Sequence, residues 1–387
     1  EGACRPNMKF SVDREHIIND FQSLAAVADK KQTLPILSNI LIRCEEDKVK
    51  LLSTDLEVEL EFVVDKAKIE APGEITIPAK KAADIIRELP EGEVMFQLND
   101  DSTKLTVKSS SGRYNLATIP GSDYPDFDAV KSEQVFEINS ERLLEMFQKT
   151  SFAMGHAKWL HFLNGCLFEK SGEALEIIAT DSHRLSCYKS QINQEGDFSG
   201  IIPRKSVIEL MKILPKKETE IKFYINTSNV VFMSKNFTFK SKLISSDTTA
   251  ASYAHFPDTS SKSIAVNRKD LLTTLSRVSV LTNHKLKLVN LKTIEGVLTV
   301  AANNQNQETA EERLEVEGDV DGFSCAFNVD YLREALNIVE DDKITIVQHE
   351  DKIETVSEGN EEVRKPQPLI IKTSDPNLML LLQPYVI

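Results

Sequence analysis

Three stretches of the chain repeat one pattern, in which a short alternating segment is followed by apolar residues at helical spacing. Apolar and polar residues alternate over 10–12, 136–138 and 264–266, as is typical of a strand. The offsets from Phe10 to Phe136 and from Phe136 to Ile264 are 126 and 128 residues, each about one domain long. Apolar residues then recur every three or four positions, as in an amphipathic helix: Ile17, Phe21 and Leu24; Leu143 and Phe147; Leu271, Leu275 and Val278. We therefore predict that each of three repeats opens with a strand that leads into a helix.

A polar residue that can cap a helix stands between strand and helix in every copy. These residues are Asp13, Asn139 and Asn267. Their side-chain oxygens can accept hydrogen bonds from the free N–H groups of a first helical turn. We predict that all three are N-caps.

A second strand and helix follow inside each repeat, over 75–89, 201–214 and 327–339. Pro78 and Pro203 stand at the start of the first two helices, where a missing N–H costs nothing. The sequence thus predicts two strand–helix openings in every repeat.

The strands between these helices end at equivalent polar pairs: Thr54-Asp55, Thr180-Asp181 and Asn303-Asn304. Such side chains often bond to nearby backbone groups, so we predict a turn held by side-chain to backbone hydrogen bonds. The predicted fold class is α+β, with three similar domains over 8–130, 131–258 and 259–387, a leader over 1–7 outside the fold, and linkers over 120–131 and 252–263. Domains of this kind expose sheet edges, which we expect to be paired between domains and between subunits.

Composition narrows the class of protein. The 387 residues are 41% hydrophobic and 27% charged, as in a globular protein, and no apolar run approaches the ~20 residues of a membrane span. We therefore expect a cytoplasmic protein without membrane contact. The five cysteines are scattered and form no C-x-x-C pair, so we expect them to be reduced core residues. We expect no metal site and no cofactor.

The net charge of −14 opposes nucleic-acid binding by the surface as a whole, but basic residues are unevenly distributed. The stretch 203–217 contains five Lys or Arg residues and one acid, Glu209, and the stretch 267–287 contains five and one acid, Asp270. These stretches could be solvated helix faces or sites for phosphate. The second predicted helix of the third repeat, within 329–342, is instead rich in acids and breaks this basic pattern. The acidic segment 350–362 is interpreted as a solvated loop.

The stretch 180–185 contains the most conspicuous chemistry, because Asp181, Ser182 and His183 are the residue types of a hydrolase. Adjacent side chains on a turn point in different directions and cannot form a relay, which argues against catalysis. His183 and Arg184 could instead be a satisfied loop pair or part of a binding site. A hydrolase and a scaffold that binds only protein remain as alternative functions at this point.

Several segments, in this order and spacing, carry a resemblance to a known family: Met8-Lys9-Phe10, Thr33-Leu34-Pro35-Ile36-Leu37, Ser53-Thr54-Asp55-Leu56-Glu57, Tyr124-Pro125, Leu163-Asn164-Gly165, Ala179-Thr180-Asp181-Ser182-His183-Arg184-Leu185 and Ile202-Pro203-Arg204-Lys205. From residue 8 to 387 the chain resembles the bacterial replicative sliding clamp, the beta subunit of DNA polymerase III. The resemblance implies three domains per chain and a homodimer closed head to tail around double-stranded DNA. Such a clamp binds DNA independently of sequence, makes the polymerase processive and has no catalytic residues.

The resemblance also implies site residues. A cleft for short peptide motifs of the polymerase III alpha subunit, the clamp loader, other polymerases and repair proteins would comprise Leu163, Thr180, His183, Arg184, Leu185, Leu381, Leu382, Gln383, Pro384, Tyr385, Val386 and Ile387. The DNA-facing residues would be Lys31, Arg204, Lys205, Lys212 and Arg277. The dimer interface would comprise Lys81, Tyr114, Leu116, Val280 and Leu281, with Glu308, Glu311 and Glu312 on its negative side. Several positions depart from the family's pattern. Ser182 replaces a Gly, Gln383 replaces a Met, 245–253 replaces a Phe-Pro-Asp-Tyr segment, and Trp159 and His161 stand in a loop where the family often has Arg and Tyr near DNA.

Overall fold

The computed structural model describes residues 7–28, 30, 34–127, 129–132, 134–253, 261–318, 321–356 and 361–385. The chain forms two compact units, unit 1 with residues 1–144 and 205–245 and unit 2 with residues 145–204 and 246–387. Within the described ranges, no helix is long and apolar enough to cross a membrane.

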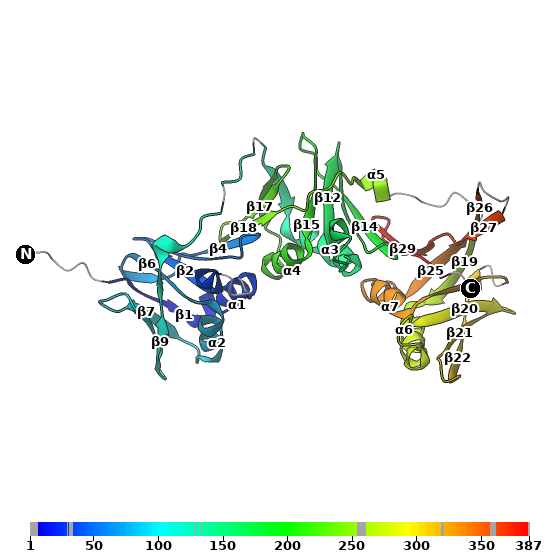
Figure 1. The fold of residues 1–387 in the computed structure, drawn as a ribbon, viewed down its shortest axis with the longest axis horizontal. Coiled ribbons are helices and arrows are strands. Elements are labelled where there is room, and N and C mark those ends of the chain that lie inside the picture. The colour runs from blue at the N-terminus through cyan, green and yellow to red at the C-terminus, as the bar shows by residue number, and fades with distance from the viewer. Residues whose placement is uncertain are drawn as a thin grey trace, which may run out of the picture. The chain divides into compact units, whose positions relative to one another are not determined.

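Unit 1 consists of two antiparallel sheets that are accompanied by helices. Its strands are β1 (Lys9–Asp13), β2 (Asn39–Cys44), β3 (Val49–Thr54), β4 (Val58–Val64), β5 (Lys68–Ala71), β6 (Gly73–Pro78), β7 (Glu93–Leu98), β8 (Lys104–Lys108), β9 (Arg113–Ala117), β10 (Ile119–Pro120), β11 (Phe136–Asn139), β16 (Glu220–Ile225), β17 (Asn229–Met233) and β18 (Phe237–Lys242). The sheets have the orders β5-β1-β7-β8-β9 and β10-β6-β2-β3-β4-β18-β17-β16-β11. Helices α1 (Ile18–Val27) and α2 (Ala79–Glu88) pack side by side (Figure 1).

Unit 2 repeats this plan. Its strands are β12 (Gly165–Ser171), β13 (Ala174–Thr180), β14 (Arg184–Gln191), β15 (Phe198–Pro203), β19 (Ser261–Asn267), β20 (Leu288–Ile294), β21 (Val297–Asn303), β22 (Thr309–Glu315), β23 (Glu317–Gly318), β24 (Ser324–Asn328), β25 (Lys343–His349), β26 (Lys352–Val356), β27 (Glu361–Lys365), β28 (Leu369–Lys372) and β29 (Leu378–Leu382). The sheets have the orders β15-β12-β13-β14-β29-β28-β25-β19-β23, β22-β21-β20-β24 and β26-β27. Helix α5 (Ala250–Tyr253) is short, and α6 (Arg268–Val278) packs against α7 (Val329–Asn337).

Helices α3 (Ser140–Thr150) and α4 (Arg204–Ile213) each belong partly to both units, because the division falls after residue 144 and before residue 205. Single 3-10 turns complete the chain: η1 (Arg14–His16), η2 (Pro35–Ser38), η3 (Gly121–Asp123), η4 (Ser151–Ala153), η5 (His161–Leu163) and η6 (Ser279–Leu281). The α+β class is confirmed.

The predicted strand–helix openings are confirmed in all three repeats. Strands β1, β11 and β19 lead into α1, α3 and α6, and strands β6, β15 and β24 lead into α2, α4 and α7. The apolar residues that predicted the first helices are buried, among them Phe21, Phe147 and Leu275. Phe21 and Phe10 both stack on Phe96, with ring centroids 6.0 and 4.8 Å away, and so tie helix α1 to its sheet.

The N-cap prediction is confirmed for two repeats and wrong for one. The Asn139 side chain accepts from the N–H groups of Glu141 and Arg142, and Asn267 accepts from Asp270. The Asp13 side chain makes no such bond, because η1 intervenes and α1 begins only after Ile17. Pro78 lies at the N-cap position of α2, one residue earlier than predicted.

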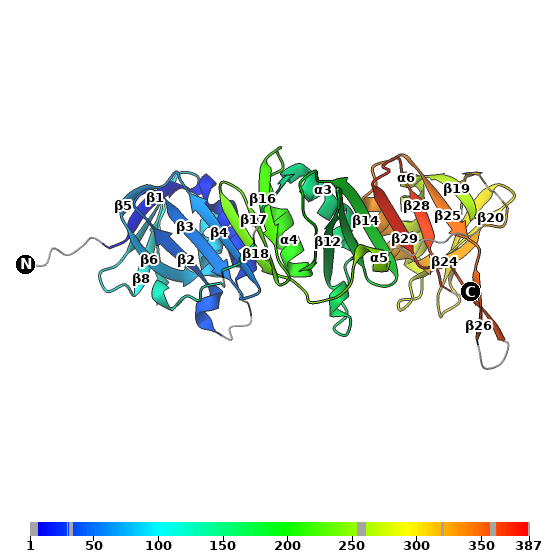
Figure 2. The ribbon, with the colours of Figure 1, turned by 90° about the horizontal axis from the view of Figure 1, so that it is seen from above.

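Sheets continue from one repeat into the next, as predicted from their exposed edges. Strand β18 pairs with β4 in unit 1, and β29 pairs with β14 in unit 2 (Figure 2). Each pairing joins strands that are more than a hundred residues apart in the chain, so neighbouring repeats share one ladder of backbone hydrogen bonds.

The interpretation of 350–362 as a loop is wrong for 352–356 and 361–362, which belong to two strands, and residues 357–360 lie outside the described ranges. Strands β26 and β27 form a hairpin in which Lys352 pairs with Lys365 and Ile353 with Arg364, and this hairpin projects from unit 2 (Figure 2). β-branched residues such as Ile353 and Thr355 favour a strand, and they outweigh the high charge of the segment.

Candidate functional site

The turn between β13 and β14 has the side-chain to backbone bonds that the Thr-Asp pair predicts. The Thr180 hydroxyl donates to the carbonyl of Arg184 (2.6 Å) and accepts from the N–H of Ser182 (3.1 Å). One Asp181 carboxylate oxygen accepts from the N–H groups of His183 (2.9 Å) and Arg184 (3.0 Å). The prediction of a side-chain-held turn is confirmed.

The same turn recurs between β3 and β4 in unit 1. Thr54 donates to the carbonyl of Val58 (2.7 Å), and Asp55 accepts from the N–H groups of Glu57 (2.9 Å) and Val58 (2.8 Å). The third residue of each turn has a left-handed backbone, with φ of 72° at Leu56 and 77° at Ser182. Glycine adopts this conformation without strain, which explains why the sequence pattern leads one to expect Gly at position 182.

Arg184 is the first residue of β14 and is almost fully buried, with 9% of its side chain exposed. Its Nε lies 3.2 Å from Asp181, and its Nη1 bonds to Glu334 of α7. The guanidinium carbon lies 4.6 Å from the centre of the Tyr331 ring, and the His183 ring stacks on the same tyrosine at 6.1 Å. These contacts fix the loop against α7.

The Asp181 carboxylate thus serves Arg184 and two backbone N–H groups. In a serine hydrolase, the carboxylate would instead orient the histidine ring. This geometry agrees with the argument from sequence that adjacent Asp, Ser and His residues form a turn and not a relay.

A hollow of about 390 Å³ opens beside this turn, entirely within unit 2. Its volume lies in the usual range of ligand pockets. Apolar side chains form most of the wall: Leu160, Phe162, Leu163, Leu185, Leu381, Tyr253 and Pro368. The polar lining comprises Thr180, Ser182, His183, Arg184, Ser252 and Gln383. An apolar wall with a few polar groups on one side can seat an apolar anchor and orient the backbone that carries it.

Seven of the residues proposed for a peptide cleft line this hollow: Leu163, Thr180, His183, Arg184, Leu185, Leu381 and Gln383. Three others lie outside the lining. Leu382 is 2% exposed, Pro384 is half-buried, and the N–H of Tyr385 donates to the carbonyl of Ala326 (2.7 Å). Val386 and Ile387 lie outside the described residues.

Six lining residues were not among the predicted cleft residues: Leu160, Phe162, Ser182, Ser252, Tyr253 and Pro368. Phe162 belongs to an apolar run beside Leu163, which is a usable signal. Pro368 precedes β28 and reaches the hollow only because β28 pairs with β29, so it has no local signal. Tyr253 comes from the segment 245–253 that departs from the family pattern, and burial raises the pKa of its hydroxyl.

Each described residue proposed to face DNA has a partner inside the chain. Arg204 donates to the carbonyl of Met154 (3.4 Å), Lys205 binds Asp55 (2.5 Å), Lys212 binds Glu209 (3.0 Å) and Arg277 binds both oxygens of Glu312 (2.7 and 2.6 Å). Lys31 lies outside the described residues. A phosphate would have to share or displace these partners. Two of the acids within 329–342, which did not fit the basic pattern of the other repeats, have partners inside the chain too. Glu334 binds Arg184, and Asp330 binds Lys287.

The proposed interface residues lie at two sheet edges and their surroundings. Tyr114 (39% exposed) and Leu116 (6%) are on β9, the last strand of its sheet, and Lys81 is exposed on α2. Val280 (75% exposed) and Leu281 follow α6 in η6. Glu311 and Glu312 lie on β22, which is the last strand of the four-stranded sheet, and Glu308 directly precedes it.

In the part of the chain that the structure describes, no group of three or more His, Cys, Asp or Glu residues could hold a metal ion. Cys44, Cys166, Cys187 and Cys325 are free and buried, as expected for core residues, and Cys4 lies outside the described residues. Burial raises the pKa of the Cys44 thiol to about 11 and that of Cys166 to about 12, so both stay protonated at neutral pH.

Three family models match consecutive parts of the chain. They describe the N-terminal, central and C-terminal domains of the DNA polymerase III beta subunit and match residues 8–128, 137–249 and 254–359. The beta sliding clamp of Escherichia coli K12 is 35% identical over 355 residues, which covers 89% of this chain and 96% of that protein. The beta sliding clamp of Pseudomonas aeruginosa is 34% identical over 343 residues, or 88% and 93% of the two chains.

Solved structures agree with this assignment. A crystal structure of the Pseudomonas aeruginosa sliding clamp bound to griselimycin matches with a TM-score of 0.87 at 29% identity, over 98% of this chain and 100% of that one. The Bacillus subtilis sliding clamp has the same fold, with a TM-score of 0.85 at 22% identity and the same coverage. The three matched domains, the repeated sheets and these relatives together place the chain in the family of the DNA polymerase III beta subunit, the bacterial DNA sliding clamps.

Proposed function

We propose that two copies of this chain close head to tail into a ring around double-stranded DNA and tether the replicative polymerase to it. The family is that of a sliding clamp and processivity factor, which supports a role without catalysis by its own residues. The domains would extend over 8–130, 131–258 and 259–387. Because the chain would act on replicating DNA, we propose that it works in the bacterial cytoplasm.

The proposed ring would close by pairing two sheet edges. Strand β9 ends one sheet of unit 1 and β22 ends one sheet of unit 2, and unpaired edges readily accept another strand. Their charges are complementary, because Arg113 lies on β9 and Lys104 and Lys108 on the neighbouring β8, whereas β22 carries Glu311 and Glu312. Tyr114 and Val280 would supply apolar contact.

Edge pairing can be tested by the oligomeric state. Asn115 accepts a hydrogen bond from Thr106 within its own sheet (2.8 Å) and Leu116 is buried in its own fold, so the exposed Val280 is the better target. We expect Val280→Asp together with Tyr114→Asp to shift the protein from dimer to monomer in analytical ultracentrifugation. A Val135→Asp variant, at an exposed apolar residue of unit 1 outside the proposed interface, is the matched control and should stay dimeric.

The hollow beside Arg184 is the observation that carries the peptide-binding part of the proposal. We propose that short, disordered segments of the polymerase III alpha subunit, the clamp loader, other polymerases and repair proteins bind there and order on binding. A Leu or Phe side chain would enter between Leu163, Leu185 and Leu381, while Arg184 and Gln383 would contact the peptide backbone.

The single tryptophan of the chain offers a direct assay for this hollow. Trp159 is 78% exposed and adjoins Leu160, a lining residue. A peptide with a Leu-Phe anchor should change its fluorescence, and Leu185→Ser should weaken binding at least tenfold. Leu286→Ser makes the same substitution at a leucine of unit 2 that is 50% exposed and does not line the hollow, and it serves as control. Unchanged affinity in Leu185→Ser would contradict the assignment of this hollow.

DNA encirclement is tested by topology. The protein, loaded on a nicked circular plasmid, should stay with the DNA during gel filtration and should escape after the plasmid is cut once. Equal loss from circular and linear DNA would refute the ring. Retention in this assay also separates the clamp from a scaffold that binds only protein.

Contact with phosphate is proposed for Arg204, Lys205, Lys212 and Arg277, with Lys31 as a further member. Binding of this kind should weaken steeply as salt rises, because counterions are released from DNA. Lys212→Gln should reduce the salt dependence of DNA binding, since the Lys212 side chain is 52% exposed and can reach a phosphate, although it also pairs with the largely buried carboxylate of Glu209 (10% exposed). Lys235→Gln, outside the basic stretches, is the control.

A further inference from the structure

A second hollow, of about 500 Å³, lies in unit 1. It is lined by Leu56, Asp126, Phe127, Thr227, Ser228, Asn229, Lys242, Leu243 and Ser245. None of these residues belongs to the proposed peptide cleft, the DNA-facing set or the dimer interface.

This hollow occupies the place in unit 1 that the cleft occupies in unit 2. The N–H of Lys242 donates to the carbonyl of Glu57 (2.9 Å), and the N–H of Gln383 donates in the same way to His183 (2.8 Å). The ladders agree, because Val58 pairs with Ser241 in unit 1 and Arg184 pairs with Leu382 in unit 2.

This register makes the lining residues of the two hollows equivalent in pairs. Leu56 corresponds to Ser182, and Lys242 corresponds to Gln383. Asn229, the first residue of β17, pairs with Lys242 in unit 1. Pro368 holds the matching position in unit 2, because it directly precedes the pair of Leu369 and Leu382. Phe127 lies 126 residues before Tyr253, which is the repeat offset. The two hollows are therefore copies of one feature of the repeat.

The chemistry of the unit 1 hollow differs from that of the cleft. Leu56 is 39% exposed on its left-handed turn and forms an apolar surface with Phe127 and Leu243. The Nζ of Lys240 lies 5.8 Å from the centre of the Phe127 ring and helps to hold it, while Lys240 also binds Glu59 (2.9 Å). Lys240 thus helps to fix the Phe127 ring, and the apolar surface lines a hollow that is open to a ligand.

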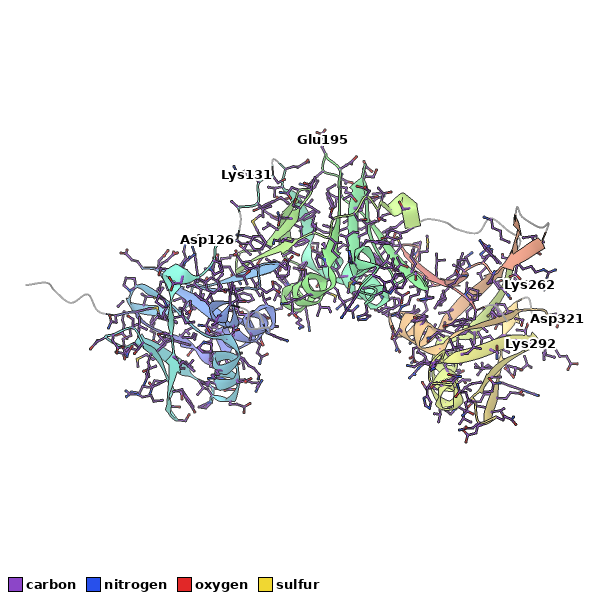
Figure 3. All side chains as sticks on the ribbon, viewed as in Figure 1. Asp126, Lys131, Glu195, Lys262, Lys292 and Asp321 are labelled. Carbon is purple, nitrogen blue, oxygen red and sulfur yellow. The ribbon has the colours of Figure 1, made fainter. Side chains whose placement is uncertain are left out.

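The charge that remains for a ligand is negative. Lys242 is already paired with Glu57 at 3.6 Å. Arg43 binds Glu74 at 2.5 Å, and this hydrogen bond together with the charges of Glu74, Asp126 and Glu61 raises the pKa of Arg43, so three acids share one guanidinium. Asp126 is exposed at the surface of unit 1 (Figure 3) and lines the hollow. A cationic group beside an apolar one would complement this arrangement.

We propose that the hollow of unit 1 is a second peptide-binding site, which takes an extended segment with a Leu or Phe next to a Lys or Arg. The apolar side chain packs on Leu56, Phe127 and Leu243, and the basic side chain binds Asp126. The proposal goes beyond the cleft of unit 2 and does not depend on peptide binding there, because its test observes different residues.

The test uses the full-length protein with ¹³C-labelled leucine methyl groups and two sets of short capped peptides at about 1 mM, a concentration suited to weak binding. One set carries a central Leu or Phe beside Lys, and the other carries Glu in place of Lys. We expect the Lys peptides to shift the methyl signals of Leu56 and Leu243. The signals of Leu163, Leu185 and Leu381 report separately on the cleft of unit 2.

Two variants give the proposal a directional check. Leu56→Ser introduces at this turn the residue that unit 2 has at position 182, and it should reduce the affinity for Lys peptides about tenfold. Asp126→Lys should reverse the preference, so that Glu peptides bind more tightly than Lys peptides. Leu185→Ser, in the cleft, should leave both results unchanged.

The proposal is overturned if the Lys peptides leave the Leu56 and Leu243 signals unmoved, or if Asp126→Lys does not alter the preference between the two sets. It is also overturned if those signals move with protein concentration in the absence of peptide, since the hollow would then receive a second copy of the chain. If the cleft of unit 2 stays silent while Leu56 and Leu243 respond, only the proposal for unit 2 fails.

Discussion

Replacing Arg184 by Met should destabilise unit 2 by about 3 kcal/mol, because removal of a buried cation leaves its acidic partners unpaired. The lost bond to Asp181, whose side chain is 15% exposed, contributes about 1.5–3 kcal/mol. The bond to Glu334 contributes about 1 kcal/mol or less, because this side chain is 46% exposed and regains water. Stacking on Tyr331 adds about 1 kcal/mol, part of which the methionine side chain restores.

The effect should be confined to the sheet that contains β14. Hydrogen exchange in low concentrations of urea, read by mass spectrometry, would give the opening free energy of peptides that cover β14 and β29, which pair directly. Peptides from β3 and β4 in unit 1 report on the equivalent turn, whose residue at this position is Val58. These peptides should be unaffected.

Arg313→Met is the matched control for this experiment. Arg313 is 73% exposed and makes a single ion pair with Glu311 at 3.4 Å, so its loss should change stability by less than about 0.5 kcal/mol. A loss below about 1 kcal/mol in Arg184→Met, or an equal loss in unit 1, would refute the view that the buried guanidinium holds this loop against α7.

Three further substitutions test single contacts. Ser182→Gly should stabilise unit 2 by about 0.5–1 kcal/mol in urea denaturation, because φ is 77° there; a loss of stability would contradict this. Tyr124→Phe should cost about 1–3 kcal/mol, since the buried hydroxyl accepts from the N–H of Thr54 (3.0 Å) and donates to the carbonyl of Asn39 (3.3 Å); an unchanged midpoint would refute it. Burial raises the pKa of the Asp20 carboxyl to about 7, above its value in the unfolded chain. The protonated carboxyl therefore contributes its full share of the folding stability below about pH 4, and this share is lost as pH rises through 7. Asp20→Asn should remove that slope, and parallel pH–stability curves for the two proteins would argue against it.

The repeat made much of this protein predictable from sequence. Local patterns sufficed for the strand–helix openings and for the Thr-Asp turns, because these depend on hydrogen bonds between residues two to four positions apart, as in Thr180 and Arg184. The family resemblance then supplied seven of the residues that line the hollow of unit 2. The prediction of an N-cap at Asp13 failed because a 3-10 turn, which has no clear signal in the sequence pattern, precedes α1.

Tertiary structure alone decided which distant residues meet. Arg184 and Glu334 are 150 positions apart, as are Lys205 and Asp55, and charge patterns along the chain do not say which acid will neutralise which base. Pro368 reaches the hollow of unit 2 because β28 pairs with β29 and β29 pairs with β14 of the preceding repeat. Lys242 reaches the hollow of unit 1 because β18 pairs with β4 of the preceding repeat. The sequence by itself therefore determined the repeated element and its turn, since both are local. The chemistry of the two hollows was decided by the fold, because each is closed by a strand from the following repeat.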